Sequence, residues 1–247
     1  MAWASAQPSL ASAQDLFEIE VFPSELAAPG DTFVDLHTNA MTGASIVGET
    51  ASVDHPFHAS VEVTHGWTSR FETGVFLETA PVVRTHGAHF GGGHIRPKFH
   101  LLEFARVPLN ISLAAEYRFS RGVFDQNRQA IELIPIVETR AGRFNIIANP
   151  AWAVSVDGPD AASLPKLSAS GRVEWERGGR VTPGMEYYWK TEALKHFDAN
   201  VDRHHFVMPT IDVAIAADWS VDLGVGHCIA GDSERWIMKS IVGYRFH

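Results

Sequence analysis

Polar and apolar residues alternate with a period of two over most of the chain beyond about residue 57. Leu109, Ile111 and Leu113 share one face of an extended segment, whereas Asn110 and Ser112 share the other. Alternation of this kind indicates β-strands with one apolar and one polar face. Because helical spacing is not sustained anywhere along the chain, the sequence predicts an all-β fold.

Turn signals divide the alternating pattern into segments that predict about twelve strands. We expect the strands at residues 32–40, 58–66, 70–80, 90–101, 108–119, 129–139, 143–154, 166–176, 181–191, 203–217, 220–229 and 236–246. Their length of roughly 9–12 residues matches a tilted strand that crosses a bilayer and exceeds the average strand of a soluble protein.

The connections between these segments alternate in length. Four are tight, at residues 67–69, 140–143, 177–180 and 218–220, and most of the others are longer and rich in Gly, Asp, Asn, Ser and His. This rhythm is typical of outer-membrane barrels, which have short periplasmic turns, long outer loops and an even number of strands. A β-sandwich, the soluble alternative, has no reason to show it. Residues 102–107 break the rhythm, because this connection is expected to be short and is not. We therefore predict a closed, antiparallel, up-and-down transmembrane β-barrel with both termini on the periplasmic side.

Aromatic residues gather at the ends of the segments, as expected for the two interfacial girdles of a membrane barrel. These residues are Trp67, Phe71, Tyr117, Phe119, Trp152, Trp175, Trp189, Trp219, Trp236, Tyr244 and Phe246. The apolar faces should then point toward lipid. On this register the outward residues include Leu109, Ile111, Leu113, Leu167, Val173, Val221, Leu223, Val225 and Val242.

The composition excludes some classes of function but does not distinguish a soluble protein from a membrane protein. Apolar residues make up 45% of the chain, a value that fits a soluble enzyme as well as a barrel, and no apolar run is long enough for a membrane-spanning helix. The net charge of −9 argues against nucleic acid as a partner. The single cysteine, Cys228, excludes an internal disulfide framework and a multi-cysteine metal site.

The N-terminus resembles the end of an export signal. Residues 1–14 are small and uncharged, and Ala11-Ser12-Ala13 fits a signal-peptidase site, although a basic start and a long apolar core are missing. We expect residues 1–14 to be a remnant signal peptide, with a disordered Ala/Ser-rich terminus as the alternative. Residues 15–31 then form an N-terminal periplasmic or lumenal segment, and residues 32–247 form the barrel.

Three stretches carry a resemblance to a known group. Residues 18–23, 35–39 and 61–76 are similar to small Gram-negative outer-membrane barrels that are grouped with the transporter-like barrels of phenol meta-cleavage pathways. The resemblance implies a twelve-stranded barrel in the bacterial outer membrane and a transport role, and it carries no catalytic residues. The final strand, which ends in Phe246-His247, resembles the C-terminal signal for barrel insertion. Outer-membrane lipid, the insertion machinery and a small-molecule solute are therefore the expected partners.

Charged residues of both signs occupy the polar faces and should line the lumen. The candidates for selectivity are Glu72, Arg96, Lys98, Glu116, Arg118, Glu132, Glu138, Arg172, Glu174, Glu186, Asp212, Lys239 and Arg245. Buried charges must pair or stay hydrated, so these residues either plug the barrel or line an open channel.

For an open channel, we expect the basic and acidic candidates to act at different levels of the lumen. The basic set would favour anionic or polar solutes, and the acidic set would oppose them. The basic set is Arg96, Lys98, Arg118 and Arg172, and the acidic set is Glu72, Glu116, Glu132 and Glu174.

Two other functions stay open alongside transport. One is a structural or interaction barrel whose lumen is plugged. The other is an outer-membrane lipid hydrolase that uses His58, Ser60 and Glu72, because a nucleophilic serine needs an adjacent base and the base needs an orienting partner. The alternation turns these three residues toward the lumen, whereas such a hydrolase needs them outward. We therefore expect no enzyme activity.

The thirteen histidines raise the question of a metal site. His86, His89 and His94 surround a glycine run, and His204 and His205 are adjacent. Imidazole suits zinc, copper and nickel, but this loop spacing matches no defined ligand motif. We assign no metal and no cofactor.

Overall fold

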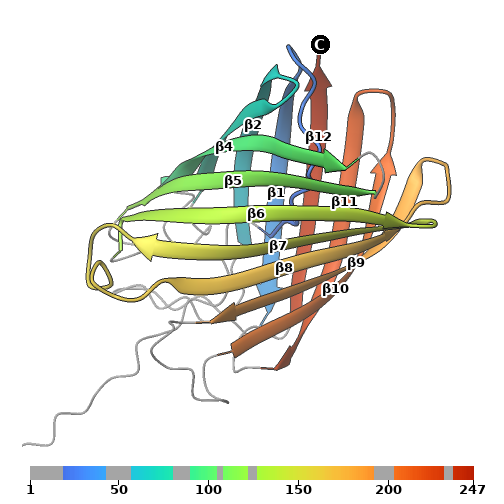
Figure 1. Ribbon diagram of the computed structural model, residues 1–247. Helices are drawn as coiled ribbons and strands as arrows, with labels where there is room; N and C mark the ends of the chain where they lie inside the picture. Colours follow the sequence, from blue (N-terminus) through green and yellow to red (C-terminus); the bar gives the residue numbers. More distant parts are fainter. Residues whose placement is uncertain are drawn as a thin grey trace, which may run out of the picture.

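The computed structural model describes residues 19–42, 57–79, 90–104, 108–121, 127–191, 203–230 and 236–247. These residues form twelve antiparallel strands (Figure 1). Their bounds are β1 Thr32–Thr42, β2 Phe57–Thr68, β3 Phe71–Thr79, β4 Phe90–Phe104, β5 Leu109–Ser120, β6 Gln129–Ala141, β7 Phe144–Ser155, β8 Lys166–Trp175, β9 Val181–Thr191, β10 Arg203–Ala214, β11 Trp219–Ala230 and β12 Trp236–Phe246.

The strands close into a barrel in which each strand pairs with its sequence neighbours and β12 pairs with β1. The closing ladder runs from the pair Thr32–Phe246 to the pair Thr42–Trp236 without a register shift. Closure leaves no unpaired sheet edge, which is required where backbone polar groups meet hydrocarbon. The predicted closed, twelve-stranded, up-and-down barrel is confirmed. Among the described residues, no helix is long and apolar enough to cross a membrane.

The strand bounds correct the prediction at two connections. Phe104 pairs with Leu109, so only residues 105–108 separate β4 from β5, and this connection follows the short-turn rhythm after all. β10 ends at Ala214 rather than at residue 217, because the N–H of Ile215 donates to the carbonyl of Trp219 (2.9 Å) and begins the turn. Gly142 lies in the tight turn between β6 and β7 with φ 64°, a conformation that glycine adopts without strain.

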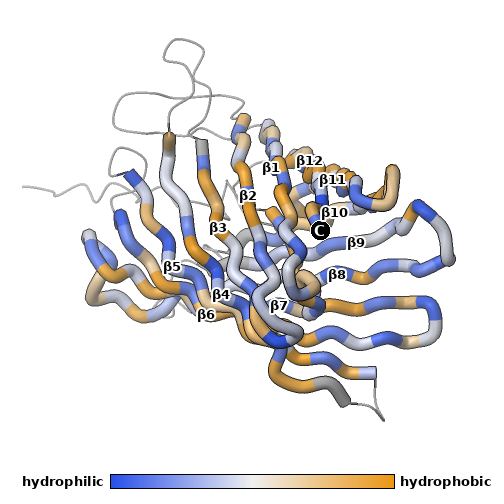
Figure 2. The backbone as a smooth tube through the Cα atoms, turned by 90° about the horizontal axis from the view of Figure 1, so that it is seen from above, coloured by the Kyte–Doolittle hydropathy of each residue, from blue (hydrophilic) through white to orange (hydrophobic). Residues whose placement is uncertain are grey.

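The two faces of the barrel wall have opposite chemistry, and the backbone colours alternate along the strands in Figure 2. On β11, Leu223 and Val225 are 47% and 49% exposed on the outer surface, whereas Asp222 is buried inside. On β5, Leu113 faces outward while Ser112 and Ala114 are fully buried. The predicted two-face pattern is confirmed. A soluble sheet would show the reverse, so this exterior suits a lipid environment.

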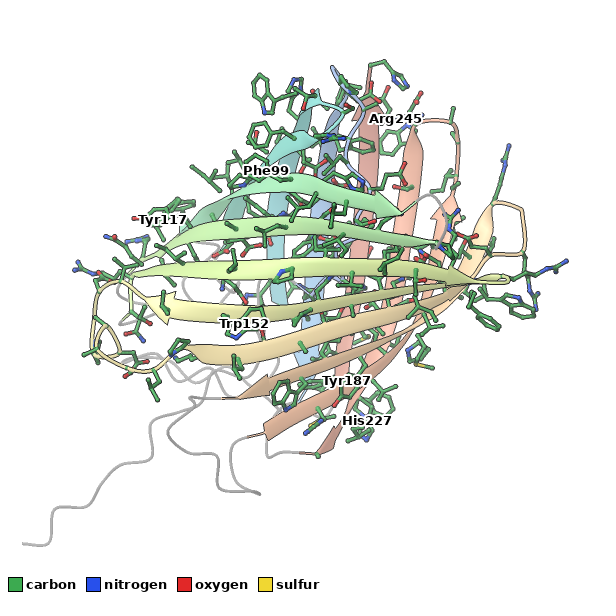
Figure 3. All side chains as sticks on the ribbon, in the orientation of Figure 1. Phe99, Tyr117, Trp152, Tyr187, His227 and Arg245 are labelled. Carbon is green, nitrogen blue, oxygen red and sulfur yellow. The ribbon has the colours of Figure 1, made fainter. Side chains whose placement is uncertain are left out.

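Aromatic side chains stand on the outer surface. Phe99, Tyr117, Trp152 and Tyr187 are 41–46% exposed and come from β4, β5, β7 and β9 (Figure 3). Exposed rings nearer the strand ends, such as Tyr117 and Trp152, can settle at the headgroup level of a bilayer. The exterior therefore has both the apolar surface and the interfacial aromatics of a membrane barrel.

The stretch before β1 lies inside the barrel (Figure 1, blue). Ile19, Val21 and Phe22 are buried and belong to one apolar cluster with inward-facing side chains of the wall. The wall side chains of this cluster are Ala114, Ile134, Ile136, Ile147, Ala151, Tyr188, Phe206, Met208 and Ile237. The lumen therefore has an apolar patch that the N-terminal stretch covers, and charged clusters lie beside this patch.

Candidate functional site: the charged lumen

One group of lumen side chains holds the N-terminal stretch; we call these residues the anchor cluster. It consists of Glu72, Lys98, Ser112, Glu138 and Asn149. Glu72 accepts a hydrogen bond from the N–H of Ala27 (2.6 Å), and Glu138 accepts one from the N–H of Ser24 (2.8 Å) and one from its hydroxyl (2.7 Å). These contacts satisfy polar backbone groups of a stretch that has no strand partner.

The other anchor residues bind the same stretch through its carbonyl groups. The ammonium group of Lys98 donates to the carbonyl of Glu25 (2.8 Å), and the Ser112 hydroxyl donates to the carbonyl of Ser24 (2.7 Å). Asn149 makes two hydrogen bonds with the backbone of Phe22: its Oδ1 accepts from the N–H (2.7 Å), and its Nδ2 donates to the carbonyl (3.1 Å). The stretch is thus bound through backbone groups as well as by apolar packing.

A second group, the Glu62–Arg96 cluster, lies on strands β1 to β5. Arg96 forms an ion pair with Glu62 and lies 3.8 Å from Glu116, and its guanidinium group stacks 4.0 Å from the centre of the Phe22 ring. Its other members are His37, Glu78, His94 and Arg118. The cluster holds three buried carboxyl groups, from Glu62, Glu78 and Glu116, beside the two guanidinium groups of Arg96 and Arg118.

A third group, the wall cluster, spans β8 to β12. Arg172 lies 3.0 Å from Glu174, 3.4 Å from Glu186 and 3.4 Å from Asp222, and it also pairs with Asp212. Lys239 contacts Glu186 at 2.7 Å and Asp222 at 3.1 Å. The side chains of Lys239 and Glu186 are both fully shielded from solvent. Every charge in this cluster comes from a strand.

The structure brings nearly all of the predicted lumen residues into these three clusters. Glu132 is half-buried on the inner face of β6 and accepts a long hydrogen bond from Ser168 (3.4 Å). Arg245 also lies outside the three clusters, at the short-turn end, where it pairs with Asp218 (3.4 Å). The expectation of separate basic and acidic levels is wrong, since Arg96, Lys98 and Arg172 each contact carboxylates directly.

The hydrolase arrangement is not formed. His58 and Ser60 are buried on the inner face of β2, and Ser60 pairs with Glu78 in the ladder. Glu72 instead pairs with Gly66, which lies about 20 Å along the strand from Ser60 at the usual rise per residue. Glu72 also accepts a hydrogen bond from Ala27 and forms an ion pair with Lys98. The three residues therefore cannot work together as a triad.

Two described histidines from the sequence analysis, His94 and His205, lie on different strands, β4 and β10. His94 lies within β4 and faces the lumen, where its ring stacks on Phe76 with centroids 4.6 Å apart. His86 and His89 lie outside the described residues, as does the remnant signal peptide expected at residues 1–14. His205 hydrogen-bonds to the hydroxyl of Tyr187 (2.5 Å). The grouping of His86, His89 and His94 that the spacing suggested therefore lies mostly outside the described residues.

The lumen residues that sequence reasoning missed include Glu20, His37, Asn149 and Asp222. Strand alternation could have found His37 and Asp222, because His37 shares the inner face of β1 with Asn39, and Asp222 opposes Leu223. Glu20 lies outside any alternating segment and carries no such signal. Asn149 lies in a strand whose inward side chains are mixed, so only the structure shows its two contacts with Phe22.

A cavity of about 580 Å³ lies beside the N-terminal stretch at the short-turn end. It is lined by Ser24–Pro29 and by wall residues that include His100, Asn110 and Glu138. This volume falls within the range of small-molecule sites. The cavity gives the lumen an accessible vestibule at the end where the N-terminal stretch enters β1.

No family model and no curated protein matches this chain. Solved structures do match. The KdgM porin in complex with disordered oligogalacturonate is 10% identical, with a TM-score of 0.63 over 87% of this chain and 99% of that one. An outer-membrane channel from Pseudomonas putida F1 is 12% identical, with a TM-score of 0.60 over 93% and 100% of the chains.

The fold is that of an outer-membrane barrel. Outer membrane phospholipase A from Escherichia coli also shares it, with 8% identity and a TM-score of 0.53 over 89% of this chain and 94% of that one. The resemblance to small outer-membrane barrels is thus confirmed at the level of fold. A fold that serves both channels and a hydrolase does not by itself decide the function, which must be argued from the site.

Proposed function

We propose that this chain is an outer-membrane channel for small solutes and that its lumen favours cations over anions. The observation that carries the proposal is the surplus of carboxylates on the inner surface of a closed barrel with an apolar exterior. The described inward acids are Asp35, Glu62, Glu72, Glu78, Glu116, Glu132, Glu138, Glu174, Glu186, Asp212 and Asp222. The described inward bases are Arg96, Lys98, Arg118, Lys166, Arg172, Lys239 and Arg245.

The surplus of acidic over basic side chains supports cationic solutes, unlike the oligogalacturonate in the KdgM porin complex. Oligogalacturonate is a polyanion, and a lumen with a carboxylate surplus repels polyanions while concentrating cations. The carboxylates best placed to act on a passing ion are those that keep some solvent contact, namely Glu132, Glu174 and Asp212. Charged rings of this kind set ion preference in other pores.

The proposed orientation places the short turns and both chain ends in the periplasm and the long connections outside the cell. It rests on the general asymmetry of outer-membrane barrels. The turns at Ser69–Arg70 and Gly142–Arg143 lie at the same end as the start of β1 and the end of β12. In this orientation the vestibule beside the N-terminal stretch opens toward the periplasm, and solutes leave the barrel past that stretch.

The proposal is tested by the reversal potential of the refolded chain in a planar bilayer under a potassium chloride gradient. We expect potassium to be more permeant than chloride. Glu132→Gln should lower the potassium-to-chloride permeability ratio, because it removes a half-buried lumen charge. Glu176→Gln is the matched control, since Glu176 pairs with Arg140 at the exposed turn and should leave the ratio unchanged.

Two results would contradict the proposal in different ways. A preference for chloride would refute the cation assignment and leave a channel. A correctly folded barrel that never conducts would refute the channel itself, and the alternative of a plugged structural barrel would then stand.

A further inference from the structure

Glu20, His37 and Glu62 meet where the N-terminal stretch crosses the inner faces of β1 and β2. One ligand-type atom from each lies within 4.8 Å of the others. His37 is 2% exposed and Glu62 is 4% exposed, so two of the three side chains are buried in the wall. The third side chain, that of Glu20, comes from the N-terminal stretch. The group therefore connects the barrel wall to this stretch in the lumen.

Two side-chain atoms of this group are not used in hydrogen bonds. Within the described part of the chain, Nε2 of His37 and Oε2 of Glu20 are buried and have no hydrogen-bond partner. Nε2 of His37 lies 3.4 Å from Oε2 of Glu62, a contact that does not meet hydrogen-bond geometry. A buried polar atom without a partner is costly, so an imidazole nitrogen and a carboxylate oxygen that both lack one leave this group able to bind a further partner.

The two oxygens of Glu62 have different tasks. Oε1 accepts a hydrogen bond from Thr64 (2.8 Å) and pairs with Arg96, and these contacts fix the orientation of the carboxylate. Oε2 is the oxygen that faces His37. Contacts that orient a ligand in this way are characteristic of metal sites, where outer partners hold the ligands in place.

We propose that Glu20, His37 and Glu62 bind a divalent transition metal ion, with Zn²⁺ as the best fit. One imidazole nitrogen and two carboxylate oxygens are common zinc ligands, and three protein ligands leave a fourth position for water. The carboxylates of Glu20, Glu62 and Glu116 together balance the ion and the guanidinium group of Arg96, which pairs with Glu62 and lies 3.8 Å from Glu116. The spacing of up to 4.8 Å exceeds the separation of about 3.4 Å between ligands of a tetrahedral zinc ion, so binding draws the three side chains together.

The site has a structural consequence that does not depend on whether the barrel conducts. Because Glu20 belongs to the N-terminal stretch and the other two ligands belong to β1 and β2, the ion fastens that stretch to the wall. The anchor cluster binds the same stretch nearer the short-turn end, through Ala27 and Ser24. A bound ion therefore adds a second fixed point deeper in the lumen.

The test is calorimetric titration of Zn²⁺ into the refolded full-length chain, with folding checked by heat-modifiable gel mobility. We expect one zinc ion per chain. Glu20→Gln and His37→Gln should each weaken binding by at least about tenfold, since loss of even an outer partner costs 10–100-fold. Glu25→Gln is the matched control, because Glu25 lies on the same stretch with an exposed side chain and should bind zinc like the wild type.

Zinc could instead bind to the loop histidines His86 and His89, so a variant that lacks both is also tested. Zinc binding that survives Glu20→Gln but disappears in a His86→Ala/His89→Ala double variant would overturn the proposal. So would a folded chain that binds no zinc. Should His37→Gln fail to fold, Glu20→Gln still decides, because Glu20 lies outside the strands. Zinc binding is measured by calorimetry and ion selectivity by the reversal potential, so the failure of one proposal can be told from the failure of the other.

Discussion

The wall cluster and the Glu62–Arg96 cluster lie in the same barrel but differ in where their partners come from. Arg172 and Lys239 contact Glu186 and Asp222, and all four residues belong to strands. In the Glu62–Arg96 cluster, Arg96 also stacks on Phe22 of the N-terminal stretch. One cluster thus consists of strand residues alone, whereas the other also includes a contact with a stretch that lies outside the strands.

This difference separates two kinds of buried charge. A charge network made only of strand residues forms when the barrel closes, and removing one member leaves the others uncompensated in a solvent-free environment. A network completed by a non-strand segment can lose that segment while the barrel stays closed. We therefore expect changes in the wall cluster to affect stability and changes near the N-terminal stretch to affect passage.

The largest effect is expected from Lys239→Met. It removes the ammonium group between Glu186 and Asp222 and leaves both carboxylates close together, with the Glu186 side chain fully shielded. Breaking a buried ion pair from one side costs about 3–5 kcal/mol. Urea unfolding of the barrel in phospholipid vesicles measures this loss. Lys166→Met, at the half-exposed pair with Asp160, is the control and should cost no more than about 1 kcal/mol.

The second expected effect comes from placing a charge on the opposite face of the wall. Leu113 faces outward in the middle of β5, where it pairs with Phe99 and Pro135. Leu113→Arg should cost about 2–4 kcal/mol if the residue lies at the bilayer midplane. The same unfolding assay measures it. An unchanged unfolding midpoint would place Leu113 outside the apolar band, and Leu113→Phe should leave the midpoint nearly unchanged.

The third effect distinguishes the N-terminal stretch from the wall. Asn149→Ala removes two hydrogen bonds to Phe22, each worth about 0.5–1.5 kcal/mol, without touching an ion pair. The barrel should stay closed while single-channel conductance rises, because the stretch is held less firmly in the lumen. Asn145→Ala on the same strand face, which removes a contact with Glu174, is the control. Equal conductance in both variants would contradict the proposed role of Asn149.

Strand positions and faces could be predicted because both follow from local alternation, which the barrel preserves on every strand. The pairing of charges could not. Lys239 and Glu186 lie on β12 and β9, which are not neighbours in the sheet, so their contact depends on how the closed wall brings inward side chains together. The sequence left residues 15–31 as either a periplasmic or a lumenal segment, because a segment without a periodic pattern shows no preferred face, and the burial of Ile19 and Val21 is visible only in the structure.

The smallest effect concerns an ion pair outside the membrane-spanning strands, at the short-turn end. Nε2 of His247 lies 2.9 Å from Oδ1 of Asp218, and Nδ1 lies 3.2 Å from Asp31. The hydrogen bond to Asp218, followed by the one to Asp31, raises the pKa of His247 above its ordinary value of 6.5. The hydrogen bond from His247, followed by the one from Arg245, lowers the pKa of Asp218 below 3.8.

These two shifts give the pair a defined pH window. The His247 contribution is fully present below about pH 6.5 and is lost as the pH rises through the raised pKa of the folded state. The Asp218 contribution is present above about pH 3.8 and is lost as the pH falls through its lowered pKa. The difference in unfolding midpoint between the wild type and His247→Gln should therefore be greatest near pH 5 and shrink toward pH 8. High salt should weaken it, because both groups are exposed. A difference that grows toward pH 8 would show that His247 acts through packing, whereas the wall cluster should keep its effect across the same range.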